Sequence, residues 1–345
     1  MLFKEKRVKF ANVFVTMWLK GITKKIKRFW YESVLGYNKR KKTYRPLDYR
    51  FIFDRWKSTY PHSWQYKVFL QYNSELRRLY FSNYNARQFV FSQLKKEGAT
   101  KESKMSQFFN MRDNALTEKQ WARNYNDFEN WTLLNAAMAL SSYFETYLSS
   151  AIMLSIESDP GILLGASKSV DGARLMKYGQ FKKKEFDYVA EECTKGEWSM
   201  RVSNLEKLFG TMPHSMIDNI GELERLRKLR NNVGHAFGRD IEKSRLYNVS
   251  QTVPIDRLSF ERFSKWQHII EKIVMDIDTI LVQNHIGSFQ PLMVYHQIYS
   301  ESDKATDNKS LGERVKKLKR QLGKDIDRKF GKTYCRTLVN YYEHL

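Results

Sequence analysis

The sequence predicts an all-α protein, and three observations support this fold class. Only six Pro and 16 Gly occur in 345 residues, so long stretches run without either. Such stretches favour helices over the frequent turns of a β-sandwich or barrel. A hydrophobic content of 42% is enough to bury a core. Several segments also repeat apolar residues at steps of three and four, which is the spacing of one helix face.

The first long helix is expected over residues 127–157. Its apolar positions recur along one face: Leu133, Ala137, Leu140, Phe144, Leu148 and Ala151. The sequence Asp159-Pro160-Gly161 predicts its end. Shorter helical patterns follow over residues 182–192 and 199–209.

A second amphipathic helix is expected before residue 238. Its apolar stripe consists of Ile217, Ile220, Leu223, Leu226, Leu229 and Val233. Ser215 followed by Asp218 resembles a capping box at its start, and Gly238 is placed to stop it. A last long helix is predicted over residues 258–285. Its apolar side carries Phe263, Trp266, Ile269, Ile270, Ile273 and Ile277.

Positive charge is concentrated at the two ends of the chain. Residues 1–50 hold 15 Lys/Arg and three Asp/Glu, a net charge of +12, and residues 311–345 hold ten and four, a net charge of +6. The total is +22, so the remaining residues carry about +4. Basic ends beside a nearly balanced middle indicate a polyanionic partner, and RNA is the leading candidate. The basic run that we expect to bind RNA comprises Lys39, Arg40, Lys41 and Lys42.

A membrane surface is the competing anion, because basic and aromatic residues also suit an interfacial helix. The apolar run Phe10–Leu19 is too short to span a bilayer, so we expect no membrane association. Cys193 and Cys335 are the only cysteines, too few for a disulfide framework, and a reducing cytoplasm is expected. The sequence also lacks a Gly-rich phosphate loop, a His-Glu-x-x-His motif and zinc-spaced Cys pairs, so no cofactor or metal is expected.

Three regions are predicted. Residues 1–125 form a basic, aromatic-rich helical region, residues 126–290 form a helical domain, and residues 291–345 form a basic helical extension. Between Tyr44 and Tyr84 the aromatic residues alternate with arginines, which suits base stacking and phosphate binding. A core of aromatic residues with solvated arginines beside them explains the same pattern equally well.

One short segment stands out as a candidate catalytic motif. An Arg followed by His after four to six residues occurs at Arg55–His62, Arg262–His268 and Arg230–His235. The first contains Pro61, which breaks a helix, and the second has apolar Phe263 after the Arg. Only the third has Asn directly after the Arg and ends a leucine-rich amphipathic helix.

The segment "LRKLRNNVGHAFG" resembles the Leu-rich helix of HEPN superfamily ribonucleases, which ends in Arg, a polar residue and a later His. The resemblance covers residues 127–286 and implies an HEPN-like helical bundle, extended by the basic N- and C-terminal regions. It implies Arg230, Asn231 and His235 as catalytic residues of a metal-independent endoribonuclease. It also implies a homodimer with a composite site, and a role as a toxin or antiviral defence effector with an antitoxin or regulatory protein as a further partner.

The residue types suit RNA cleavage independently of the family. Asn231 and His235 lie one turn apart on a helix, with Arg227 one turn earlier and Arg230 at the flank of that face. Histidine can move protons near neutral pH, and arginine can bind a phosphate through its fork of donors. Arg227 is expected to contribute to RNA binding.

The family often carries an acidic residue on its first core helix, and Glu145 is the candidate here. Ser149 stands where a basic residue usually follows four positions later. A second interpretation stays open: Arg230 and His235 are ordinary residues at a helix C-terminus, where cations and caps are common. The protein is then a non-catalytic helical protein that binds nucleic acid or another partner.

Overall fold

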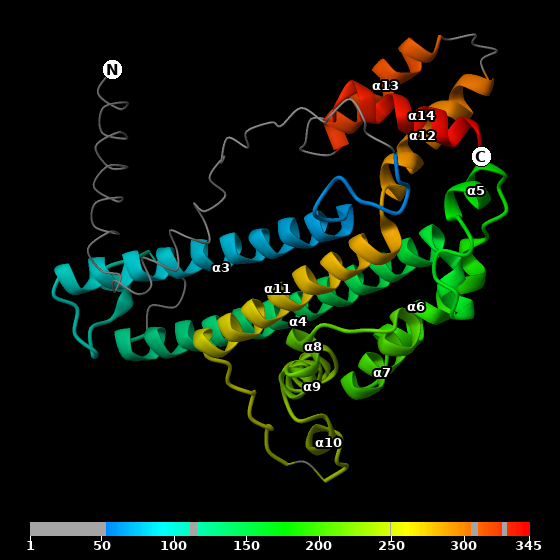
Figure 1. Ribbon diagram of the computed structural model, residues 1–345. Coiled ribbons are helices and arrows are strands. Elements are labelled where there is room, and N and C mark those ends of the chain that lie inside the picture. Colours follow the sequence, from blue (N-terminus) through cyan, green and yellow to red (C-terminus); the bar gives the residue numbers. More distant parts are fainter. Residues whose placement is uncertain (1–52, 111–115, 249, 305–309, 326–329) are drawn as a thin grey trace, which may run out of the picture. The chain divides into compact units, whose positions relative to one another are not determined.

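Three long helices lie side by side in the part of the chain that the structure describes (Figure 1). The computed structural model describes residues 53–110, 116–248, 250–304, 310–325 and 330–345. The long helices, each in contact with the other two, are α3 (Trp64–Lys96), α4 (Glu118–Ser158) and α11 (Phe260–Leu281). These described residues contain helices and no β-strand, so the predicted all-α class is confirmed.

Shorter helices cover α4 and its C-terminal end. Those between α4 and α11 are α5 (Gly172–Lys177), α6 (Asp187–Thr194), α7 (Trp198–Phe209), α8 (His214–Ile217), α9 (Ile220–Ala236) and α10 (Ile241–Ser244). Single-turn helices occur at Met105–Gln107, Pro160–Leu164, Lys183–Phe186 and Val282–Ile286. Helices α6 and α9 pack on α4, and α7 contacts both α6 and α9. The C-terminal helices pack against one another: α12 (Phe289–Lys304), α13 (Leu311–Asp325) and α14 (Lys332–Glu343).

The ends of α4 follow recognisable sequence signals. Thr117 and Gln120 form a capping box at its start, in which each side chain bonds the other residue's backbone N–H. The helix ends at Ser158, directly before Asp159 and Pro160, as the sequence predicts. It begins nine residues before the predicted start at residue 127, because its first turns carry aromatic side chains that pack on α3. The ring of Trp121 lies 5.2 Å from that of Phe91.

Most of the predicted apolar positions are buried, but Ile269 of α11 is only partly buried and Ile217 is exposed in α8. On α4 the buried positions comprise Leu133, Ala137, Leu140, Phe144, Leu148 and Ala151, and on α11 Phe263, Trp266, Ile270, Ile273 and Ile277. Burial of these side chains is the main favourable contribution to folding.

The predicted capping box at Ser215 and Asp218 is wrong. Ser215 lies inside the short helix α8, and α9 begins only at Ile220. The Ser215 hydroxyl donates to the Asp276 carboxylate of α11 at 2.7 Å. A tertiary partner has therefore replaced the local backbone N–H that a capping serine would bind.

The predicted boundaries between the three regions fall inside helices. The boundaries at 125/126 and 290/291 lie inside α4 and α12, and Arg50–Leu345 forms one compact unit. Residues 311–325 and 332–343 are helical, in keeping with the helical C-terminal extension. The basic N-terminal segment, including Lys39 to Lys42, lies outside the described residues.

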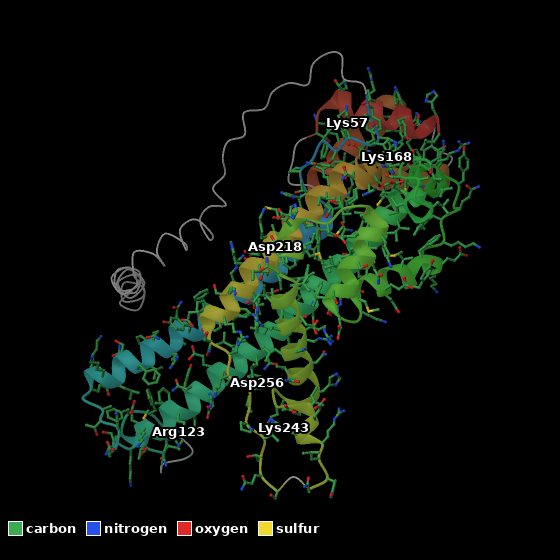
Figure 2. All side chains as sticks on the ribbon, turned by 60° about the horizontal axis from the view of Figure 1, so that its bottom comes forward. Lys57, Arg123, Lys168, Asp218, Lys243 and Asp256 are labelled. Carbon is green, nitrogen blue, oxygen red and sulfur yellow. The ribbon has the colours of Figure 1, made fainter. Side chains whose placement is uncertain are left out.

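A buried arginine joins the C-terminal end of α4 to the turn after α11. The Arg55 side chain is 2% exposed, and its Nε donates to the Asp171 carboxylate at 2.9 Å. Its other nitrogens donate to the Ser158 hydroxyl and to the Ile286 carbonyl oxygen. Burial lowers the pKa of Arg55, and the Asp171 carboxylate opposes this shift. Figure 2 labels Lys57 close to this junction.

We predict that Arg55→Leu lowers the free energy of unfolding by about 3–5 kcal/mol, because Asp171 and two carbonyl groups lose a buried partner. Urea denaturation measures the change. Lys57→Ala is the matched control, since Lys57 is 84% exposed and lies 3.9 Å from Asp54. A loss below about 1 kcal/mol for Arg55→Leu contradicts the prediction.

Candidate active site

Helix α9 presents the segment Arg230–His235 in its last two turns. Leu223, Leu226 and Val233 are buried on one side of the helix, which packs on α4. The helix ends at Ala236, followed by Phe237 and Gly238 in the left-handed conformation with φ angles of 53° and 79°. The Gly238 N–H donates to the Asn232 carbonyl oxygen at 2.9 Å. Gly238 thus ends the helix as predicted, with the motif just before the end.

Arg230 lies between an amide and a carboxylate. Its Nη1 donates to Asn231 Oδ1 at 3.2 Å, and its Nη2 is 3.8 Å from Glu145 Oε2 on α4. The Arg230 side chain is 38% exposed. Its guanidinium is therefore held at one edge and open to solvent at another, where it can meet an anion.

Glu145 is shared between two arginines. Its Oε1 accepts a hydrogen bond from Arg201 Nη1 at 3.1 Å, while its other oxygen faces Arg230. Arg201 comes from α7, is 4% exposed, stacks on the Trp198 ring and donates to the Gly196 carbonyl oxygen. Burial lowers the pKa of Arg201, and the hydrogen bond to Glu145 opposes this shift. The structure thus brings the predicted Glu145 next to the predicted Arg230.

Sequence reasoning missed Arg201, although a signal was present. Arg201 occupies a position on the apolar face of α7, between Trp198 and Leu205 at helical spacing. A buried arginine within an apolar stripe needs an acidic partner, and the partly exposed Glu145 is that partner. Arg201 supplies the cation that the sequence lacks at Ser149.

Arg227 is engaged by an acid of its own helix. Its Nε lies 2.9 Å from Glu224 Oε2, and its Nη2 donates to the other carboxylate oxygen. This fork-like pairing raises the pKa of Arg227 and lowers that of Glu224. The charge of the predicted RNA-binding Arg227 is thus largely offset within α9.

His235 is exposed at the last turn of α9. Among the described residues its imidazole has no hydrogen bond and no ion pair. Asn231 lies one turn earlier, but its Oδ1 accepts from Arg230 and does not orient the imidazole. Arg230 therefore contacts both Asn231 and Glu145. His235 lies on the same helix as Arg230 and Asn231, and its exposed imidazole can bind a ligand.

A second feature adjoins Glu145 on α4. An open depression of about 530 Å³ is lined by Ser142, Glu145, Thr146, Ser149, Ser150, Met153 and Asp187. Its polar groups are hydroxyls and two carboxylates. Because the carboxylates repel anions, this depression does not suit a phosphate group.

The other two Arg–His matches are accounted for by packing. Arg55 is the buried arginine bound to Asp171, and His62 Nδ1 lies 3.3 Å from the buried Asp278. Arg262 is stacked on the ring of Trp266, its neighbour one turn away. Arg55 is therefore unavailable at the surface, whereas Arg262 and His268 are exposed on α11. Among the described residues the Arg262 side chain contacts the Trp266 ring, where Arg230 contacts an amide and a carboxylate.

The arginines that alternate with aromatic residues are paired with acids where the structure describes them. Arg77 lies 2.8 Å from Glu271, and Arg78 lies 3.2 Å from Glu75. Like Arg55, they stabilise the helices around α3, so the core interpretation of this segment fits the described residues better than base binding.

The C-terminal extension carries its positive charge on one side. Helix α13 buries Val315, Leu318 and Leu322 and exposes Lys316, Lys319, Arg320 and Lys324. No large exposed hydrophobic side chain occurs on the described parts of α13 or α14. This face therefore suits a polyanion better than a lipid interior.

No family model, curated protein or solved structure matches the chain. Across the described ranges, no helix combines the length and the apolar character needed to cross a membrane. In the same ranges, no three His, Cys, Asp or Glu side chains gather as ligands for a metal ion.

We predict that Glu145→Gln lowers the free energy of unfolding by about 1–3 kcal/mol, because the buried Arg201 loses its acidic partner. Arg230→Gln should change it by less than about 1 kcal/mol, since the pair with Glu145 is long and partly exposed. Chemical denaturation of both variants tests the difference. Equal losses would mean that Glu145 is held as firmly by Arg230 as by Arg201.

Proposed function

We propose that the chain is a metal-independent endoribonuclease of the HEPN type. The observation that carries the proposal is the exposed edge of α9, where Arg230 is bound by Asn231 and by Glu145 of α4, and His235 lies one turn further on. The residue pattern resembles the HEPN motif, and a cation, an amide and an imidazole at one open edge are what phosphodiester cleavage requires.

In the proposed reaction the 2′-hydroxyl oxygen of a ribose attacks the adjacent phosphorus. The bond from phosphorus to the 5′ oxygen of the next nucleotide breaks, which leaves a cyclic phosphate and a free 5′-hydroxyl. His235 either removes the 2′-hydroxyl proton or protonates the leaving 5′ oxygen. Arg230 binds the phosphate oxygens as negative charge builds up on them.

Glu145 and Asn231 act as positioning residues in this scheme. Each contacts one edge of the Arg230 guanidinium, so together they restrict the directions in which its remaining N–H groups point. Arg201 holds Glu145 from the buried side through a hydrogen bond of 3.1 Å. The protein thus orients the Arg230 donors before RNA arrives, which reduces the cost of reorganisation in the transition state.

The biological role follows from the resemblance alone. HEPN enzymes of this kind commonly act as toxins or antiviral defence effectors, and we propose the same role for this chain. An antitoxin or regulatory protein is then a natural partner, and the cytoplasm is the natural location.

We predict that His235→Ala and Arg230→Ala each abolish RNA cleavage, while Asn231→Ala retains part of it because an orienting group contributes less than the proton carrier. The assay uses purified protein, mixed cellular RNA and EDTA, in which cleavage by the parent protein should persist. Circular dichroism verifies that each variant is folded.

Lys228→Ala is the matched control for this test, since Lys228 is an exposed cation of the same helix outside the motif. Full cleavage by both the His235 and Arg230 variants would falsify the catalytic assignment. Binding of RNA without cleavage by the parent protein would favour the non-catalytic interpretation.

We also propose that two chains pair with their Arg230–His235 segments facing each other, because one imidazole per chain cannot serve as both acid and base. Mixing the His235→Ala and Arg230→Ala chains restores some cleavage only if each site draws different groups from both chains, whereas a site that needs both imidazoles stays inactive in the mixture. Light scattering gives the oligomeric state. A monomer that is fully active at its working concentration contradicts the pairing.

The basic ends are proposed to supply RNA affinity that does not depend on sequence. Lys316, Lys319, Arg320 and Lys324 share the exposed side of α13, which supports this role at the C-terminal end. Contacts of this kind release counterions from RNA, so binding should weaken steeply as salt increases. The cluster Lys39 to Lys42 is assigned the same role from its sequence.

A further inference from the structure

Phe237 combines two unfavourable features at the end of α9. Its side chain is 78% exposed, and its backbone has a φ angle of 53°, in the left-handed region. Among the described residues only Lys168 is another non-glycine residue with positive φ. A large aromatic ring gains nothing from exposure to water, and a side chain with a Cβ is disfavoured in this conformation. An exposed ring and an unfavourable backbone conformation at the same residue indicate that Phe237 serves a function.

The backbone at Phe237 is fixed by its surroundings. The N–H of the next residue, Gly238, donates to Asn232, and the Gly238 carbonyl oxygen accepts from the Asp256 N–H at 2.6 Å. A Cβ at Gly238 would lie 2.9 Å from Leu134 on α4, so this turn is pressed against the core. The ring of Phe237 therefore projects into solvent from a rigid base.

The surroundings of the ring suit a nucleotide. Phe237 follows His235 by two residues, so their Cα atoms lie at most about 7 Å apart. Residues 220–247 carry seven Lys/Arg and four Asp/Glu, a net charge of +3. The fully exposed Tyr247 follows in the segment between α9 and α11, four residues after Lys243, which Figure 2 labels. Exposed aromatic rings beside cations are the usual means of holding unpaired bases.

We propose that Phe237 stacks on an unpaired nucleobase of single-stranded RNA next to the phosphate that His235 receives. The inference rests on the proposed function for the identity of the ligand. It makes Phe237 a positioning residue, which holds the strand so that one phosphodiester lies at the catalytic edge. Stacking depends little on which base is stacked. Phe237 therefore determines where along a single strand the cut falls, and has less effect on which RNA sequence is cut.

The test measures binding of short single-stranded RNA that contains 2-aminopurine, a fluorescent base that is quenched on stacking. The His235→Ala chain is used throughout, so that the RNA stays intact. Phe237→Leu should weaken binding about five- to 100-fold and abolish the quenching, whereas Phe237→Trp should retain both. Tyr178→Leu is the matched control, because Tyr178 is 56% exposed directly after the separate helix α5 and should not affect binding.

Phe237→Asn separates binding from folding. Asparagine tolerates the left-handed conformation, so this variant should unfold at a urea concentration at least as high as the parent while it loses RNA affinity. Loss of affinity in a more stable protein cannot come from unfolding.

Three results overturn the inference: affinity and quenching unchanged in Phe237→Leu, no binding of single-stranded RNA by the parent chain, or a change in oligomeric state alone. The last result would mark Phe237 as a contact between protein chains. Quenching that depends on Phe237 in a protein without cleavage activity would support the stacking site and reject the proposed reaction, so the two failures are distinguishable.

Discussion

The burial of α4 is the constraint on which the rest of the structure depends. Leu140, Phe144, Tyr147 and Leu148 form one buried face of this helix, and from Ala151 to Ile156 every residue is buried. A helix segment that is buried all round needs several neighbours to cover it. Helices α3 and α11 cover one part of it, and α6 and α9 cover another. The position of α9 is thus a consequence of the composition of α4.

One carboxylate of this helix then determines the electrostatics of the candidate site. Glu145 cannot lose its hydration without cationic partners, and it obtains them from two different helices. The buried partner, Arg201, is held by a shorter contact than the exposed partner, Arg230. This inequality leaves Arg230 oriented but not fully neutralised, which is the state in which a guanidinium can still bind phosphate.

The sequence was sufficient for the helices whose apolar residues repeat in a regular way. The core positions of α4 and α11 and the end of α9 at Gly238 could be predicted because helical periodicity and capping are local properties. For α3 the sequence predicted only a helical region over residues 1–125 and no helix bounds, although Phe69, Asn73, Leu76 and Tyr80 are buried at steps of three and four. The contact between Glu145 and Arg201 joins residues 56 positions apart, so only the packing of α7 beside α4 reveals it. By contrast, the pairing of Arg227 with Glu224 spans three residues and was open to prediction.

The two ends of the segment between α9 and α11 lie side by side. Arg239 pairs with Ile255 in an isolated bridge, and Asn130 on α4 binds the backbone on both sides of Arg257. Asp256 lies at the base of this loop, while Lys243 lies farther out (Figure 2). Because the two stems are fastened independently of the tip, the intervening residues can be lengthened, shortened or exchanged at small entropic cost. The fold therefore allows this segment to change in length and sequence while α9 and the core beneath it keep their places.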